Sequence, residues 1–438
     1  MAQAVKGDVY RSLGEKIDNL TARAPWNETF HNILKELYTP EEADVVVKMP
    51  YTLSSVERIA KVTKVEKARL STILEKLCKK GLVMDMWNEK AKQYYYMPSP
   101  IVIGIFELTM MRRGDNLNAK EWARLFHEYM QGDDTFYAAN SAHGEQISIM
   151  RVIPIEETIK TDEHIEFFDY EKASSLIENA QKFAIGFCSC RNEKYQMGEK
   201  DCDAPLDSCS VFDSCAEMLI RNNMAREVSK SEMQENFARS KELGLVLCSW
   251  NIKKPFSMCH CCKCCCSYLG AVSKFGYMNF INTSNFISKI DESLCKGCGT
   301  CVDVCPVNAM SLISANDPKN KKKKKGRVNN ETCVGCGVCA LRCPTNAIEM
   351  INRGKRVIRP ESLFEQAMLA SLERGNLQNQ IFDNPRSVTQ KFMRPLIGGF
   401  LRLPRVKRAL MSDTFRSSFL GFMKNGAKMQ GKGWVTEL

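Results

Sequence analysis

Two cysteine runs repeat each other in the second half of the chain and constrain its fold more than any other feature. Residues 295–306 read Cys-Lys-Gly-Cys-Gly-Thr-Cys-Val-Asp-Val-Cys-Pro, and residues 333–344 read Cys-Val-Gly-Cys-Gly-Val-Cys-Ala-Leu-Arg-Cys-Pro. A tight C-x2-C-x2-C turn aims three sulfurs at the corners of one 4Fe-4S cube, and the fourth cysteine of each run ligates the other cube. The predicted ligands are Cys295, Cys298, Cys301 and Cys343 for cluster 1, and Cys333, Cys336, Cys339 and Cys305 for cluster 2.

The spacing and the small residues within the runs favour clusters over zinc ribbons or disulfides. Gly297, Gly299, Gly335 and Gly337 let the backbone turn tightly and bring amide N–H groups near the inorganic sulfides. Zinc sites place two C-x2-C knuckles about fifteen residues apart, and they lack the third C-x2 step and the trailing C-P. The two runs therefore predict iron–sulfur clusters.

With these motifs, residues 285–355 resemble a bacterial two-cluster ferredoxin. The resemblance implies a βαββαβ module with twofold pseudosymmetry that transfers single electrons at low potential. This chain departs from the family at Lys319 and Lys321–Lys325, a lysine run that lengthens the linker between the halves. The run is interpreted as a solvated loop or as a surface that steers an acidic partner.

Length and composition place the remaining sequence among globular multidomain proteins. The 438 residues are 44% hydrophobic and 26% charged, enough for two to four domains. The longest apolar stretch, Ile101 to Met111, contains Glu107, so no transmembrane helix is expected. The first residues show no secretory or twin-arginine signal, and the 21 cysteines gather in clusters as metal ligands do in a reducing compartment. We expect a cytoplasmic protein.

The first 98 residues carry the signals of a winged-helix-like domain. Thr39-Pro-Glu-Glu42 is a helix start, Ser54-Ser-Val-Glu57 is a second capping box, and a third helix follows that ends at Gly81. Residues 82–87 and 93–96 are predicted to form a β-hairpin across a polar turn. Helix, helix-turn-helix and hairpin over residues 35–98 resemble a winged helix.

A winged helix can bind DNA or dock a protein. Its third helix offers six basic side chains against two acidic ones, so phosphate contacts are electrostatically feasible: Lys64, Lys67, Arg69, Lys76, Lys79 and Lys80 against Glu66 and Glu75. No effector or dimerisation signature lies nearby, and docking is the preferred interpretation. Residues 99–140 are expected to form a helical connector, with Trp122, Phe126, Tyr129 and Met130 as a core stripe.

Residues 141–284 are the second cysteine-rich stretch, and we expect them to form an α/β module that binds metal. An extended segment at 147–153, a helix from about Tyr170 to Lys182 and a helix from Ser229 to Gly244 surround the cysteines. Six thiols within residues 259–266 would repel one another as thiolates unless a cation held them. The candidate ligands are Cys188, Cys190, Cys202, Cys209, Cys259, Cys261, Cys262 and Cys264.

This stretch resembles a cysteine-rich module found upstream of dicluster ferredoxins in anaerobic bacteria and archaea. The resemblance extends through the winged helix, and we expect one or two further iron–sulfur clusters, with zinc as the alternative. His260 is a ligand candidate, and a hydrogen bond to a ligand is the other interpretation. Cys78 and Cys248 are expected to be buried, inert thiols.

Residues 356–438 form a basic tail with amphipathic helical patterning. Between Arg386 and Lys432 lie eleven Lys or Arg and a single acid, Asp413. Such a segment can lie on an anionic membrane, dock a partner, or pack back on the protein with its cations solvated.

Taken together, the sequence predicts an α+β multidomain iron–sulfur protein. It has no G-x-G-x-x-G, Walker or G-x-S-x-G motif, so we expect no enzyme activity of the chain alone. The preferred hypothesis is an electron carrier that passes single low-potential electrons between redox partners, as a protein or as a subunit of an oxidoreductase complex. The alternatives are a redox-responsive DNA-binding regulator and a reductive activator of another metalloenzyme. Peripheral contact with the inner face of the membrane is a further possibility.

Overall fold

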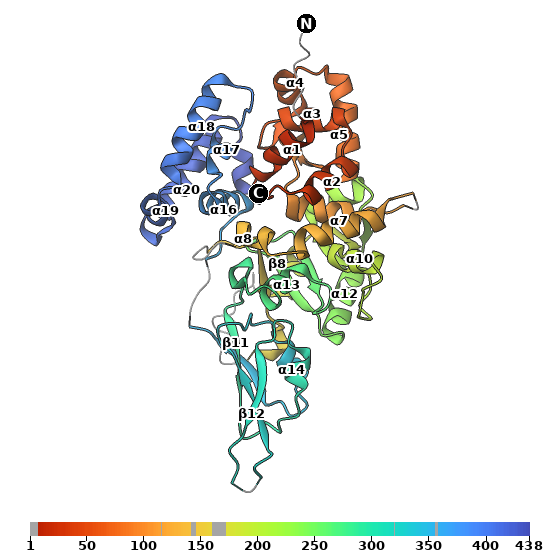
Figure 1. Cartoon of the computed structure of the whole chain (residues 1–438), viewed down its shortest axis with the longest axis vertical. Helices are drawn as coiled ribbons and strands as arrows, with labels where there is room; N and C mark the ends of the chain where they lie inside the picture. Colours follow the sequence, from red (N-terminus) through yellow and green to blue (C-terminus); the bar gives the residue numbers. More distant parts are fainter. Residues whose placement is uncertain (1–7, 115, 142–145, 160–171, 319, 355–357) are drawn as a thin grey trace. The chain divides into compact units, whose positions relative to one another are not determined.

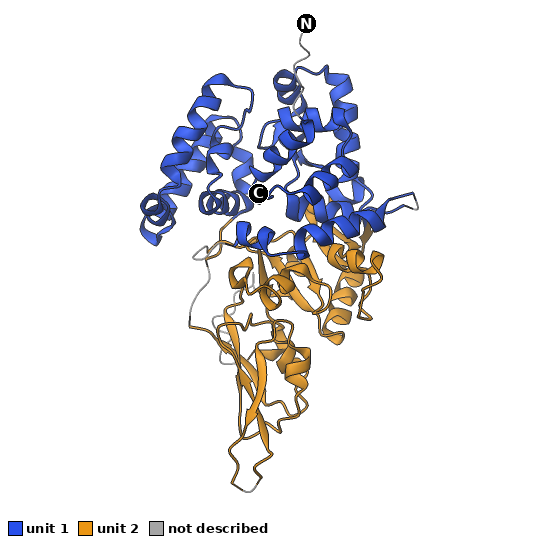
Figure 2. Ribbon diagram, in the orientation of Figure 1, with its two compact units in different colours: residues 1–142, 218–225, 362–438 blue, residues 143–217, 226–361 orange. Residues whose placement is uncertain are grey.

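The computed structural model describes residues 8–114, 116–141, 146–159, 172–318, 320–354 and 358–438 (Figure 1). These residues belong to two compact units, which Figure 2 shows in different colours. Unit 1 comprises residues 1–142, 218–225 and 362–438, and unit 2 comprises residues 143–217 and 226–361. None of the helices formed by the described residues is long and apolar enough to cross a membrane. Lys319 and the start of the helix expected at Tyr170 lie outside the described residues.

Unit 1 begins with short amphipathic helices and a hairpin. Its elements are α1 Val9–Asp18, α2 Glu28–Leu37, α3 Pro40–Lys48, β1 Ser54–Ser55, α4 Val56–Thr63, α5 Lys67–Lys80, β2 Val83–Asn88 and β3 Gln93–Pro98. The strands form an antiparallel sheet of order β1-β3-β2. Thr39 and Glu42 make the expected capping box at α3, and Gly81 ends α5 in the left-handed conformation, as predicted.

The second capping box was predicted one residue too early. Ser55, not Ser54, caps α4 by accepting a hydrogen bond from the N–H of Arg58. Ser54 is in β1 instead, where it pairs with Tyr96 of β3. Ser55 also pairs in β1, with Tyr95, and as the last residue of the strand it has the extended backbone of an N-cap directly before α4.

Apart from residues 218–225, which contain the end of α11 Asp213–Arg221 and the start of β7 Ala225–Val228, the remaining elements of unit 1 are helices. They are η1 Ile101–Ile105, α6 Phe106–Met111, α7 Ala119–Gln131, α8 Thr135–Asn140, α16 Leu363–Arg374, α17 Leu377–Ile381, α18 Val388–Leu401, α19 Pro404–Met411, α20 Asp413–Met429 and η6 Gly433–Glu437. The predicted stripe on α7 is buried: Trp122, Phe126, Tyr129 and Met130 are all at most 6% exposed. A buried carboxylate, Asp383, joins the C-terminal helices to the N-terminal ones through Arg58 at 2.7 Å and Lys432 at 2.7 Å.

Unit 2 contains a mixed sheet with helices packed on it. Its elements up to residue 282 are β4 Met150–Ile153, η2 Glu156–Thr158, α9 Ala173–Asn179, β5 Phe183–Phe187, α10 Ser189–Gln196, β6 Asp207–Phe212, α11 Asp213–Arg221, β7 Ala225–Val228, α12 Lys230–Glu242, β8 Val246–Trp250, β9 Ser257–Cys261, α13 Ser267–Ser273, η5 Met278–Phe280 and β10 Ile281–Asn282. Among the described residues, the sheet has seven strands in the order β10-β4-β8-β9-β6-β5-β7. Side chains such as Phe212, Phe237 and Met258 form an apolar core between this sheet and α9 and α12.

One helix of this module begins where the sequence predicted, and another ends earlier than predicted. Helix α12 begins after a capping box between Ser229 and Glu232, as predicted. The helix expected to run to Lys182 ends at Asn179, and Phe183 then begins β5.

The end of unit 2 follows the order β-α-β-β-α-β that the ferredoxin resemblance implied. The elements are β11 Phe286–Ile290, α14 Thr300–Val304, β12 Met310–Ser314, β13 Lys324–Val328, α15 Val338–Leu341 and β14 Ile348–Asn352. Strand β11 pairs antiparallel with β14, and β12 pairs antiparallel with β13. The two halves therefore correspond by a pseudo-twofold relation. In each half the cysteine run starts after the first strand and continues through the helix, so that its fourth cysteine follows the helix.

Candidate metal centres

The two cysteine loops depend on glycines whose neighbours leave no room for a side chain. Gly297 has φ +67°, and a Cβ atom there would lie 2.1 Å from the carbonyl oxygen of Lys324. Gly335 occupies the equivalent place in the second loop, with φ +71° and a Cβ position 2.1 Å from the carbonyl oxygen of Phe286. Only glycine accepts both the left-handed backbone and this close approach. Each loop is therefore held tightly against a neighbouring strand.

The four residues predicted for cluster 1 line one pocket. Cys295, Cys298 and Cys301 come from the first run, and Cys343 comes from the second, across the pseudo-twofold axis. Ile290, Leu312 and Ile348 supply an apolar wall. The backbone N–H of Gly326 donates to Cys295 Sγ at 3.4 Å, and that of Ala347 donates to Cys343 Sγ at 3.3 Å. Such hydrogen bonds to sulfur are what a bound cluster requires of its surroundings, so these residues fit a 4Fe-4S group.

The four residues predicted for cluster 2 are also neighbours of one another. Burial raises the pKa of the Cys336 thiol, and neighbouring Cys339, Cys333 and Cys305 raise it further. Cys305 is the member from the other run, and its sulfur accepts the N–H of Ala309 at 3.1 Å. This bond corresponds to the one between Ala347 and Cys343, as the pseudosymmetry of the sequence predicts.

The two quartets differ in exposure. All four cysteines predicted for cluster 2 are buried, whereas Cys298 is exposed and Cys295, Cys301 and Cys343 are half-buried. The loop of cluster 2 also contacts the first part of unit 2, since the N–H of Ile155 donates to the Cys336 carbonyl oxygen at 3.1 Å. Cluster 1 therefore faces the outside of unit 2, and cluster 2 faces its cysteine-rich sheet.

Strand register brings further cysteines to one face of that sheet. Cys248 of β8 lies directly opposite Cys259 of β9, and the register Ser210↔Met258 places Cys209 of β6 next to Cys259. Because side chains alternate along a strand, Cys261 shares the face of Cys259, and His260 points to the other side. Helix N-caps complete the group, with Cys188 at α10 and Cys266 at α13.

Side-chain contacts link these thiols. Hydrogen bonds join Cys209 to Cys259, Cys261 to Cys248, Cys259 and Cys266, and Cys266 to Cys190. We call these six residues, Cys190, Cys209, Cys248, Cys259, Cys261 and Cys266, the linked thiols. Cys248 was expected to be an inert thiol, but the register places it inside this group. Cys266 was absent from the predicted ligands.

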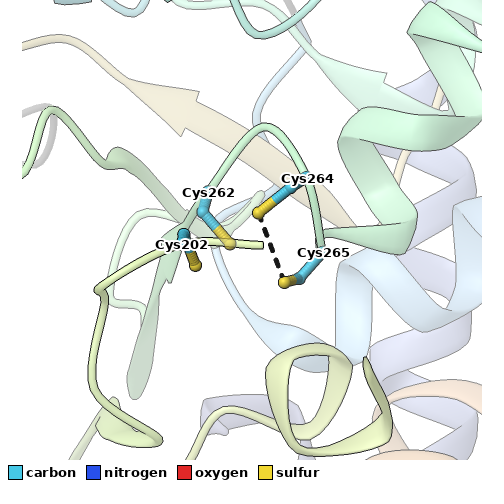
Figure 3. A group of neighbouring side chains, drawn as sticks. All are labelled: Cys202, Cys262, Cys264 and Cys265. Carbon is cyan, nitrogen blue, oxygen red and sulfur yellow. Dashed lines mark hydrogen bonds between the residues drawn. The ribbon is translucent and has the colours of Figure 1, made fainter. Parts of the chain in front are cut away.

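A second group lies on the turn after β9. The sulfurs of Cys202, Cys262, Cys264 and Cys265 all lie within 4.8 Å of one another (Figure 3). We call these four residues the tetrathiolate group. Three of them were predicted ligands, and Cys265 was not. The alternation that orients side chains ends with β9 at Cys261, so no sequence rule shows which thiols of the following turn converge.

His260 is not placed as a metal ligand. Its Nε2 lies 2.8 Å from Ser210 Oγ and its Nδ1 lies 2.7 Å from Ser240 Oγ, so both ring nitrogens are engaged. The ring is 1% exposed and packs edge-on against Phe237. Burial lowers the pKa of His260 to about 3. A structural hydrogen-bonding role therefore replaces the ligand interpretation.

Arg191 is the positive charge buried among the cysteines. Its guanidinium donates to Ser208 Oγ at 2.7 Å and to the carbonyl oxygen of His260 at 2.7 Å. Burial raises the pKa of the Cys188 thiol to about 12, and Arg191 opposes this shift, since a nearby cation favours the thiolate. A hydrogen bond with Cys265, together with the charge of Arg191, lowers the pKa of the Cys262 thiol to about 4. The sequence analysis did not identify this arginine, because its partners are distant in the chain.

Three cysteines that precede the ferredoxin module belong to neither group: Cys188, the N-cap residue of α10, which lies near Cys259 and Cys262, and the more distant Cys78 and Cys215. Burial raises the pKa of Cys78 to about 12, in agreement with the expected inert thiol. Burial likewise raises the pKa of Cys215 to about 12. Neither thiol is activated as a nucleophile or ligand.

Comparison with known protein families supports the central motif. Residues 294–347 match the family described as 4Fe-4S dicluster domain. No curated protein matches the chain. The matched segment contains all eight cysteines of the two repeated runs, and the family assignment applies to this segment. The chain thus carries a ferredoxin-like iron–sulfur domain, and its cysteine groups support a role in electron transfer.

Proposed function

We propose that the protein is an electron carrier that receives single low-potential electrons at cluster 1 and passes them through cluster 2. Bound 4Fe-4S groups supply the redox step, since each exchanges one electron without a coupled proton. The observation that carries the proposal is the unequal exposure of the two quartets, with the exposed thiol of Cys298 on one side and the four buried thiols of cluster 2 on the other. Exposed ligands admit a partner, and buried ligands face the interior of unit 2.

One lysine lines the exposed quartet and a lysine run precedes its Gly326 contact, and this charge favours an acidic redox partner. Gly326, which donates to Cys295, directly follows the run Lys321–Lys325. Lys321, Lys322 and Lys324 are exposed, and Lys296 lines the cluster 1 pocket itself. A positive surface beside a redox centre raises the local concentration of an anionic partner and speeds its encounter.

The test is a charge reversal with a distant control. The triple variant Lys321→Glu, Lys322→Glu, Lys324→Glu is compared with Lys120→Glu, an exposed lysine in unit 1. Stopped-flow oxidation of the reduced protein by anionic ferricyanide should be roughly tenfold slower in the triple variant at low salt. Oxidation by neutral benzoquinone should not change. An equal loss of rate with both oxidants, or no loss with ferricyanide, would contradict electron exchange with an acidic partner at this edge.

We further propose that the linked thiols hold one additional iron–sulfur cluster. Among the described residues, no three of the linked thiols come as close together as the tetrathiolate group does. A wider spread of thiols suits a cluster better than a single ion. Iron and sulfide analysis of the Cys190→Ser variant tests this, because it should lose about four iron and four sulfide per chain relative to the parent. An unchanged iron content would refute the additional cluster.

The basic C-terminal helices suggest that the carrier works at an anionic membrane surface. Eight of the exposed large apolar side chains lie on or beside α18–α20: Val388, Phe392, Leu396, Phe400, Leu403, Phe415, Phe422 and Met429. On α18 they recur every four residues, and exposed Lys391, Arg402, Arg405 and Arg408 accompany them. An apolar stripe flanked by cations is complementary to anionic headgroups.

Vesicle binding tests the membrane proposal. The full chain should sediment with phosphatidylglycerol vesicles and not with phosphatidylcholine vesicles. Phe392→Ser with Phe400→Ser should weaken this binding at least tenfold, since each buried ring contributes about 1–2 kcal/mol. Tyr195→Ser is the matched control, because Tyr195 and Phe400 are both 56% exposed. Absence of binding to anionic vesicles, or self-association through this face, would contradict the proposal.

Ion pairs disfavour the rival DNA-binding function. Lys67 pairs with Glu57 at 2.6 Å, Arg69 with Glu41 at 2.5 Å, and Lys80 with Glu42 at 2.7 Å. Half of the six cations counted on and before the third helix are thus partly neutralised by acids of the same domain. Binding of duplex DNA measured at several salt concentrations tests the rival, since a DNA-binding protein should show a steep loss of affinity with salt. Our proposal predicts a weak and shallow response.

A further inference from the structure

The four sulfurs of the tetrathiolate group converge on one point. Cys262, Cys264 and Cys265 project from the turn between β9 and α13, and Cys202 approaches from the loop between α10 and β6 (Figure 3). All four sulfurs lie within 4.8 Å of one another, and those of Cys264 and Cys265 are 3.4 Å apart. Four free thiols have no attraction strong enough to gather in this way, so the geometry indicates a bound cation.

The sulfur spacing discriminates between a single ion and a cubane. In a tetrahedral site with metal–sulfur bonds of about 2.3 Å, the sulfurs are about 3.8 Å apart. In a cubane each thiolate binds a different iron, and the sulfurs are roughly 6 Å apart. The spread of at most 4.8 Å therefore fits one ion and is too narrow for a cubane.

The ferredoxin module provides an internal comparison. Its eight run cysteines are all described, and no three of them fall within 4.8 Å of one another as those of the tetrathiolate group do. The sulfurs are therefore widely spaced in the quartets for which the repeated runs predict cubanes, and closely spaced only in the tetrathiolate group among the described quartets. Sequence alone assigned these thiols to a further iron–sulfur cluster, with zinc as the alternative.

We propose that Cys202, Cys262, Cys264 and Cys265 bind a single zinc ion in a closed tetrahedral site. Four thiolates leave no open coordination position, which is typical of structural zinc and not of catalytic zinc. Soft sulfur ligands in this geometry suit zinc. The ion would join the turn leading into α13 to the loop leading into β6, a crosslink between segments about sixty residues apart in the sequence.

The surroundings are suited to such an ion. Cys262 and Cys265 are buried and pack with Ala204 and Leu245 in a small apolar cluster, which shields these two sulfurs from water. Four thiolates around a divalent ion carry a net charge of −2, and the guanidinium of Arg191 hydrogen-bonds to Cys262. Lys200 donates to the carbonyl oxygen of Cys202 and adds a second positive charge. These contacts offset the negative charge of the site.

Metal analysis of the full chain tests the proposal. Zinc, iron and acid-labile sulfide are measured on the same sample, purified without oxygen and then treated with excess iron and sulfide. We expect about one zinc per chain that survives this treatment. Cys264→Ser should lower zinc affinity at least tenfold in a chelator competition, without loss of iron or sulfide. Cys264 is the exposed member of the group, so its substitution leaves the buried packing intact.

Controls separate this site from the ferredoxin clusters. Cys78→Ser, a buried thiol outside both groups, should retain the zinc. Exchange with cobalt should produce the absorption bands of a tetrahedral cobalt thiolate, and Cys265→Ser should abolish them. A chain without zinc, or a Cys264→Ser variant that loses iron and sulfide together, would overturn the proposal. Because iron and sulfide report on the ferredoxin clusters independently, this result does not depend on whether those clusters transfer electrons.

Discussion

Substitution of Gly297 by alanine should release cluster 1 while leaving the rest of the chain folded. The alanine Cβ would lie 2.1 Å from the carbonyl oxygen of Lys324 and 2.6 Å from its carbonyl carbon. Strand β13 would have to retreat by about 1 Å, at an overpacking cost of about 1–3 kcal/mol. The left-handed backbone at φ +67° adds about 1–2 kcal/mol for a residue with a Cβ. The retreat also draws the N–H of Gly326 away from Cys295.

Gly299→Ala separates the two costs. Gly299 has φ +92°, but a Cβ atom there meets only Leu312 Cδ1, at 3.6 Å. Gly299→Ala should therefore incur the backbone strain of about 1–2 kcal/mol and retain its iron. Gly297→Ala should lose about four iron per chain and one of the two reducible centres seen by electron paramagnetic resonance. Equal iron retention in the two variants would refute the argument from close approach.

Further predictions concern single side chains. Ser288→Ala removes the hydroxyl 3.2 Å from Cys339 Sγ, a bond that stabilises the more negative reduced state, and should lower the potential of cluster 2 by about 20–60 mV in a redox titration. Asp383→Asn leaves Arg58 and Lys432 without their buried partner and should cost about 3–5 kcal/mol in urea unfolding of unit 1 followed by circular dichroism. Arg58 and Lys432 hold the pKa of Asp383 well below its usual range, so the unfolded chain binds more protons as the pH falls. The stabilisation is therefore complete above about pH 4 and lost below it, and the difference between parent and variant should shrink in that window. Cys78→Ser should change neither iron nor zinc content, because Cys78 is 3% exposed and belongs to neither the linked thiols nor the tetrathiolate group.

The ferredoxin module could be predicted from the sequence almost completely, because its motifs consist of residues that lie close together in the sequence. The spacing of Cys295, Cys298 and Cys301 fixes a turn, and the repeat of the run fixes the partner quartet. The cross-run membership of Cys343 in cluster 1 follows from the same rule, and the structure brings all four residues to one pocket. The capping boxes at Thr39 and Ser229 could likewise be predicted from the sequence, since each involves two residues three positions apart.

The cysteine-rich module could not be predicted in the same way, because its contacts depend on strand register. Cys209, Cys248 and Cys259 become neighbours only when β6, β9 and β8 pair in one particular alignment. A shift of one residue would move each thiol to the opposite face. The convergence of Cys202 and Cys265 depends on a turn outside any regular element, so Cys265 was missed. Strand β1 was also missed, because two residues are too few for an alternating pattern.

Reversible electron exchange at the two ferredoxin quartets is central to the proposed function, and one titration tests it directly. Protein purified without oxygen is reduced and then reoxidised stepwise with a one-electron oxidant, while cluster absorbance and paramagnetic signals are followed. We predict at least two reversible one-electron equivalents per chain, and Cys336→Ala should remove the equivalent that belongs to cluster 2. A fully iron-loaded chain that takes up no electrons reversibly, or a Cys336→Ala variant that keeps every equivalent, would contradict the proposed function.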